Sequence, residues 1–82
     1  MNFIVVGCGR VGAELSYRLF KNGHQVVVVD SDQKAFNRLQ PDFRGRVVEG
    51  EALSSDALSR AGIDKSDGIA VVTNSDTMNA VI

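Results

Sequence analysis

The sequence lacks several features that would point to particular classes of protein. It has no tryptophan, one cysteine and one histidine among 82 residues, so an internal disulfide is excluded and the single thiol fits a reducing compartment. No apolar run approaches the ~18 residues that span a bilayer. The short apolar segment at the start also lacks the basic leader of a signal peptide. We therefore expect a soluble, cytoplasmic chain.

An excess of charge of one sign is also lacking. Nine lysines and arginines against ten aspartates and glutamates give a net charge of −1, and these charges form no runs, which argues against a nucleic-acid or anionic membrane partner. No spacing typical of metal ligands occurs, and no nucleophile stands beside a base. We expect no metal, no catalytic residue and a single small domain over residues 1–82.

What the sequence does contain is an apolar run, 3–6, that turns directly into a glycine segment of the form GxGxxG. Gly7 suits a tight turn, Gly9 lets the backbone approach a pyrophosphate, and Gly12 permits close packing of a helix on the strand. The free N–H groups and the dipole of that helix favour an anion at the same point. The segment therefore predicts a nucleotide site.

A second apolar run, 25–29, ends in Asp30, 18 residues after Gly12. An acid roughly 20 residues beyond the glycines binds the adenosine ribose in dinucleotide sites. A helix N-terminal acid is the structural alternative, but hydrogen bonds from ribose hydroxyls to a carboxylate are stronger than that dipole effect. The carboxylate would repel a 2′-phosphate, and Ser31 follows where an NADP site would present arginine. We expect NAD(H) or ATP/ADP, with NADP disfavoured.

Strands and helices alternate along the whole chain. The expected strands are 3–6, 25–29, 46–50 and 68–73. Expected helices begin after the glycines, at Ser31 or Asp32, and at Ser54 or Ser55, the last of them stopped by Gly62. A fourth helix, opened by residues 74–76, would have just begun when the sequence stops.

This alternation predicts a Rossmann-like α/β fold. Right-handed crossovers would give a parallel sheet in the order 3-2-1-4, with the polar third strand at one edge. A complete doubly wound domain has more strands, so the chain resembles an amino-terminal fragment truncated after the start of the fourth helix. Its fourth strand would then be an exposed edge that invites pairing with another copy.

Ligands in such sheets bind outside the carboxyl ends of the strands, where the strand order reverses. In the expected order that point lies between the first and fourth strands. Residues 7–12 and Thr73 to Asp76 should therefore face each other across one crevice.

Other residues in these segments have two interpretations each. Arg10 is favoured as a phosphate clamp over a solvated first-turn side chain. Cys8 fits a small apolar turn residue better than a redox sensor, and His24 a surface residue better than an acid or base. Asp76 and Glu51 could form a catalytic carboxylate pair, but fit better as a helix N-terminal acid and a ligand contact.

Four blocks in register resemble the regulator of potassium conductance domain (RCK or KTN, TrkA-N type) of Trk and Ktr potassium-uptake systems. The resemblance covers Phe3 to Asn79. In the third block Glu51 and Leu53 depart from the family's usual Gly-Asp-Ala-Thr. The blocks are Gly7-x-Gly9-Arg10-Val11-Gly12, Val29-Asp30-x-Asp32, Gly50-Glu51-Ala52 ahead of a helix ending Ala61-Gly62-Ile63, and Thr73-Asn74-x-Asp76 with Asn79.

The resemblance implies a cytosolic module that binds NAD(H) or ATP/ADP and gates a membrane potassium pore as a dimer or larger ring. The enzyme alternative is the amino-terminal half of an NAD-dependent oxidoreductase, since one fold supports many functions. By resemblance, the residues that hold the phosphates are Gly7, Gly9, Arg10, Val11 and Gly12. The remaining contacts are Asp30 to the ribose, Glu51 and Ala52 to the adenine edge, and Thr73, Asn74, Asp76 and Asn79 to the far phosphate or second nucleoside.

Overall fold

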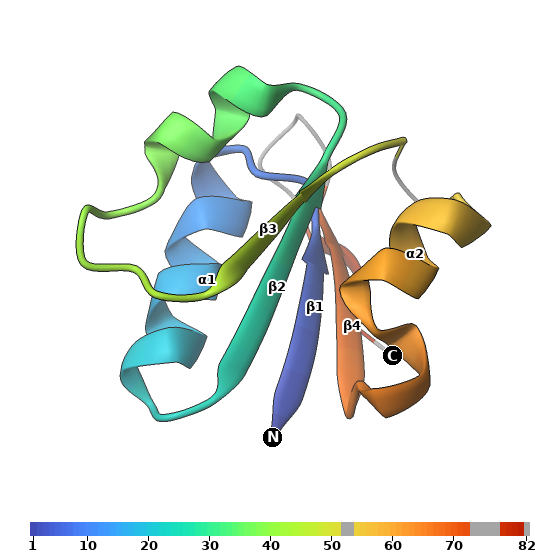
Figure 1. Ribbon diagram of the computed structural model, residues 1–82. Helices are drawn as coiled ribbons and strands as arrows, with labels where there is room; N and C mark the ends of the chain where they lie inside the picture. The colour runs from blue at the N-terminus through green and yellow to red at the C-terminus, as the bar shows by residue number, and fades with distance from the viewer. Residues whose placement is uncertain (52–53, 73–77, 82) are drawn as a thin grey trace.

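A computed structural model describes residues 1–51 and 54–72, and the backbone of 78–81. Strands and helices alternate, as the sequence predicts (Figure 1). The elements in order are β1 (Asn2–Val6), α1 (Arg10–Lys21), β2 (Gln25–Asp30), the 3-10 helix η1 (Gln33–Arg38), β3 (Arg46–Glu49), α2 (Ser55–Ala61), the 3-10 helix η2 (Ile63–Lys65), β4 (Gly68–Val72) and β5 (Met78–Val81).

The sheet has the order β3-β2-β1-β4-β5, and its first four strands are parallel. The expected order 3-2-1-4 and the edge position of β3 are therefore confirmed. In the register of β1, Val6 lies beside Val29 of β2 and Val71 of β4. The carboxyl ends of these three strands thus meet at one edge of the sheet, directly before the glycine turn.

The prediction of a fourth helix is wrong. Residues Met78–Val81 form β5, which pairs antiparallel with β4. A strand in this place satisfies the N–H and C=O groups along the edge of β4, and this pairing outweighs the helix-start signal of residues 74–76. The exposed edge of β4, from which the sequence predicted self-association, is therefore covered, and the description of the chain as ending inside a fourth helix does not hold.

Helices cover both faces of the sheet (Figure 1). Val5 packs with α1 and η1 in one buried cluster, whereas its neighbours Ile4 and Val6 pack with α2 and η2 in another. Val28 and Val29 of β2 divide between the same two clusters. A central strand buried on both faces explains the uninterrupted valine run of β2.

The segment after β2 is shorter and tighter than an α-helix. Asp32 rather than Ser31 caps it, since its carboxylate accepts a hydrogen bond from the Lys34 backbone N–H at 3.0 Å. The 3-10 helix ends at Arg38, just ahead of Pro41. Ala35 is the one buried residue of this segment. Because α-helices in proteins are stabilised mainly by packing of a buried face, so little burial does not support a full α-helix here.

Helix α2 begins and ends with side chain and backbone signals visible in the sequence. The Ser54 hydroxyl accepts a hydrogen bond from the Ala57 N–H at 3.1 Å, and Gly62 ends the helix in the left-handed conformation at φ +87°. Ser54 is therefore the cap, and Ser55 is the first helical residue.

We expect Ser54→Ala to lower the free energy of unfolding by about 1 kcal/mol, because the Ala57 N–H loses its acceptor. Ser55→Ala is the matched control, since Ser55 is exposed and follows the cap; it should change stability by a few tenths of a kcal/mol at most. Urea denaturation of both variants measures the difference in the free energy of unfolding. Equal decreases in the two variants would show that Ser54 does not cap the helix.

Candidate functional site

The glycine turn leaves β1 at the carboxyl edge of the sheet. Gly7 adopts φ +102°, and its N–H donates to the Val29 carbonyl at 2.7 Å, so the turn starts while the chain is still bonded to β2. A Cβ built on Gly7 would overlap the backbone carbonyl of Val72 at the end of β4. The positive φ and this overlap both require glycine here, as the sequence predicts.

Helix α1 starts at the turn without a side chain over its amino terminus. Gly9 is the cap residue and makes no side-chain hydrogen bond, and the first turn carries no acidic residue. The first intrahelical bond runs from the Ala13 N–H to the Gly9 carbonyl at 2.9 Å. The N–H groups before Ala13 therefore have no acceptor within the helix and point to where an anion would bind.

Gly12 brings α1 close to the strand that precedes it. A Cβ on Gly12 would overlap the carbonyl oxygen of Gly7 and lie 3.8 Å from a methyl group of Val5. The predicted role of Gly12 in close helix-to-strand packing is confirmed.

The Asp30 carboxylate lies at the end of β2 and is half-buried. Its Oδ2 accepts a hydrogen bond from the Cys8 N–H at 2.7 Å, and its Oδ1 accepts one from the Asp32 N–H at 2.8 Å. One side chain thus ties the glycine turn to the segment after β2. A carboxylate has about four lone-pair sites, so two remain for other donors.

The segment after β3 reaches the same edge. The Gly50 N–H donates to the Asp30 carbonyl at 3.0 Å, which places Glu51 beside the end of β2. Glu51 and Ser31 are both exposed. The structure therefore brings together residues 7–12, Asp30, Ser31 and Glu51.

The other residues expected at the site lie outside the described residues. They are Ala52, Thr73, Asn74 and Asp76. The expected crevice between the glycine turn and 73–76 therefore stays a prediction, although Gly7 does meet Val72, the last residue of β4. Asn79, named by resemblance, falls within β5.

An arginine that the sequence reasoning missed lies beside the glycine turn. The charge of Arg38, at the end of η1, acts on the Cys8 thiol. Arg38 and Arg10 also line one hollow of about 580 Å³ along α1. This hollow runs along the flank of α1 as far as Arg18 and also includes Glu14. The only signal in the sequence was a basic residue a few positions beyond the ribose acid, which is too common to single out.

The Cys8 side chain is fully buried. Burial, and then the negative charge of Asp30, raise the pKa of the Cys8 thiol from 9.0 to about 11, while the Arg38 charge opposes them. Since the thiolate is the reactive form, the thiol is inert near neutral pH. This geometry favours the packing interpretation over a redox sensor.

We expect the native Cys8 thiol to react with Ellman's reagent at pH 8 at least about a hundredfold more slowly than in urea, because a pKa two units higher cuts the thiolate fraction about a hundredfold. Because the folded pKa lies above the unfolded one, this protection is present below pH 9 and fades towards about pH 11. Equal rates in the native and unfolded chain would restore the sensor interpretation.

Two other kinds of site are absent from the described ranges. No group of three or more His, Cys, Asp or Glu residues there could hold a metal ion. No helix in the same ranges is long and apolar enough to cross a membrane.

Comparison with known proteins agrees with this geometry. Residues 3–82, which include the glycine turn and Asp30, match the TrkA-N domain. The chain belongs to the TrkA-N domain family. The TrkA-N match and the resemblance drawn from the four sequence blocks therefore coincide.

Relatives of this TrkA-N chain are much longer than the chain itself. It is 40% identical over 81 residues to the Trk system potassium uptake protein TrkA of Streptomyces coelicolor, covering 99% of this chain and 36% of that protein. It is 34% identical over 79 residues to TrkA of Vibrio alginolyticus, covering 96% and 17%. Potassium channel protein 1 of Methanocaldococcus jannaschii is 33% identical over 82 residues, covering 99% and 25%. The chain thus spans about a third or less of these relatives.

Proposed function

We propose that this TrkA-N chain binds an adenine nucleotide, NAD(H) or ATP/ADP, outside the carboxyl ends of β1 and β2, and thereby regulates potassium transport. It binds without catalysing a reaction, in the cytoplasm at the inner face of the membrane. A membrane potassium channel or transporter subunit is its partner, and the chain acts as a homodimer or larger oligomer.

One observation carries the binding half of this proposal. The Cys8 N–H donates to the Asp30 carboxylate at 2.7 Å, so the ribose acceptor and the amino terminus of α1 are held in a fixed relation. A nucleotide presents its ribose hydroxyls and its phosphates at a similarly fixed spacing. A site preorganised in this way loses less conformational entropy on binding.

The same residues select among nucleotides. A 2′-phosphate placed at Asp30 would meet a carboxylate, and Ser31 offers no positive charge beside it. NADP is therefore disfavoured, whereas a 2′-hydroxyl donates to the carboxylate. Arg10 and Arg38 line the hollow beside α1 and suit a diphosphate or triphosphate.

The proposed contacts follow the order of the chain. Gly7, Gly9, Arg10, Val11 and Gly12 hold the phosphates, Asp30 and Ser31 face the ribose, Glu51 and Ala52 the adenine edge, and Thr73, Asn74 and Asp76 the far phosphate or second nucleoside.

The regulatory half rests on the relatives, two of which are named as Trk potassium uptake proteins and one as a potassium channel protein. A nucleotide regulates a pore only if it binds two arrangements of the assembly with different affinity. In this proposal the nucleotide, bound at the carboxyl edge of the sheet, has a higher affinity for one arrangement of the assembly than for the other.

Calorimetric titration of the chain with NADH, NAD, ATP, ADP, AMP and NADPH in parallel tests the proposal. We expect NADH and ATP to bind and NADPH to bind at least tenfold more weakly. Binding of NADH without ATP would favour the oxidoreductase alternative, because a hydride-transfer enzyme has no use for ATP there. Absence of binding by every nucleotide would contradict the proposal.

A further inference from the structure

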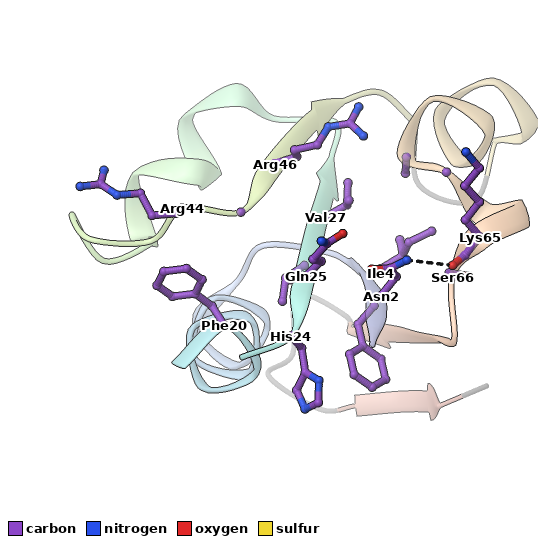
Figure 2. Close-up of a pocket in the computed structure, with 15 residues that line it drawn as sticks. Asn2, Ile4, Phe20, His24, Gln25, Val27, Arg44, Arg46, Lys65 and Ser66 are labelled. Carbon is purple, nitrogen blue, oxygen red and sulfur yellow. Dashed lines mark hydrogen bonds between the residues drawn. The ribbon is translucent and has the colours of Figure 1, made fainter. Parts of the chain in front are cut away.

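A second hollow, of about 440 Å³, lies at the opposite end of the sheet from the glycine turn (Figure 2). The first residues of β1, β2 and β3 line it, together with the end of α2 and η2. Because β1 has five residues, the two ends of the sheet are roughly 15 Å apart. This hollow is therefore separate from the proposed nucleotide site, and its volume is typical of small-molecule pockets.

Cations line this hollow without matching acids. Arg44, Arg46 and Lys65 are among its lining residues, and within the described ranges no aspartate or glutamate is. The chain as a whole carries a net charge of −1, so positive charge is concentrated here. Asp67 is the neighbouring acid: its Oδ2 accepts a hydrogen bond from the N–H of Asn2, a lining residue, at 2.7 Å, so its charge offsets part of this positive charge.

Two of these cations come from different elements of the fold. Figure 2 shows the Arg46 guanidinium and the Lys65 ammonium both above the Gln25 amide, with Arg44 directed away from them. The Lys65 backbone carbonyl accepts a hydrogen bond from the Asn2 side chain at 3.2 Å, which holds the backbone of Lys65 in place. Its ammonium makes no ion pair with any residue that the structure describes.

The Arg46 guanidinium is held in place but not saturated. One of its terminal nitrogens donates to the Arg60 carbonyl at 3.2 Å. A guanidinium carries five N–H donors, so others remain for a ligand. A positioned arginine and a lysine together suit a doubly charged oxyanion.

The base of the hollow is apolar. Val27 lines it and belongs to the cluster packed under α2, where Ile4 below it is already buried, and Phe20 lines its other side. Inorganic anions gain nothing from such a surface. An organic group attached to the anion would bury apolar area there.

We propose that this hollow binds a small organic phosphate monoester, with the phosphate at Arg46 and Lys65 and the organic group on Val27. The site is independent of the proposed nucleotide site, because it lies at the other end of the same strands.

Phenyl phosphate is the probe, titrated into the ¹⁵N-labelled chain at low ionic strength and followed by amide chemical shifts. We expect saturable shifts confined to Gln25, Arg46, Gly62 and Lys65. Phenol, which lacks the charge, and inorganic phosphate, which lacks the ring, should each bind at least fivefold more weakly. Shifts at the glycine turn alone, or equal binding of either control compound, would overturn the proposal.

Lys65→Gln should weaken phenyl phosphate binding at least fivefold, since it removes one of the two cations. Lys34→Gln is the matched control, because Lys34 is an exposed lysine on η1 that does not line the hollow; its affinity should equal that of the unchanged chain. A dispersed spectrum of Lys65→Gln establishes its fold. Unchanged affinity in the folded Lys65→Gln chain would remove the site.

Discussion

Replacing Gly7 by alanine is expected to lower the free energy of unfolding by about 3 kcal/mol. The Gly7 backbone has φ +102°, where a Cβ costs roughly 1–2 kcal/mol. That Cβ would also overlap the Val72 carbonyl, and overpacking typically costs a further 1–3 kcal/mol. A domain of this size has a total stability of roughly 4–12 kcal/mol, so the variant should lose a quarter or more of it.

Gly23→Ala separates the two contributions. Gly23 has a similar φ of +89°, but a Cβ there meets no atom within 4 Å. This control should therefore show the conformational cost alone, about 1–2 kcal/mol. Urea denaturation followed by circular dichroism measures both variants. If the two losses were equal, the close approach of the glycine turn to β4 would be contradicted.

Asp30→Asn is expected to impair both stability and binding. Asparagine keeps one acceptor oxygen but turns an amide NH₂ towards either the Cys8 or the Asp32 N–H, each of which now donates to a carboxylate. Hydrogen bonds to charged groups are worth about 1.5–3 kcal/mol, so unfolding should become easier by about 2 kcal/mol. Adenine nucleotide affinity should fall at least tenfold, about 1.4 kcal/mol.

The two effects of Asp30→Asn can be read separately. Denaturation without ligand reports the hydrogen bonds, and calorimetry with ATP or NADH on the folded fraction reports the ribose contact. Asp56→Asn serves as control, because its side chain is 83% exposed and pairs with Arg60 on the same helix. Lost stability with unchanged affinity would make Asp30 a purely structural residue.

Much of the fold was predictable because short stretches of sequence decided it. The valine run 26–29 predicts a strand buried on both faces, and it is one. The alternation of strands and helices, with right-handed crossovers, fixed the order of the four parallel strands. A Cβ at Gly7 or Gly12 would overlap backbone atoms, and Gly62 ends α2 in the left-handed conformation.

The candidate site was predictable only in part. The glycine turn and Asp30 follow from motif spacing, but the hydrogen bond from Cys8 to Asp30 joins two segments 22 residues apart, and no local pattern encodes it. Arg38, at the end of η1, lines one hollow with Arg10 of α1. Its position depends on how that helix packs against α1.

The sequence by itself determined the glycine turn, the caps and the parallel core, because these depend on backbone conformation and on periodic burial within single segments. Tertiary structure alone decided the conformation of Met78–Val81. A four-residue segment is too short to show a periodicity of its own, and pairing with the edge of β4 makes it a strand. It also decided the basic hollow at the amino-terminal edge. That surface is assembled from the ends of separate strands and helices, so its positive charges come together only once the chain has folded.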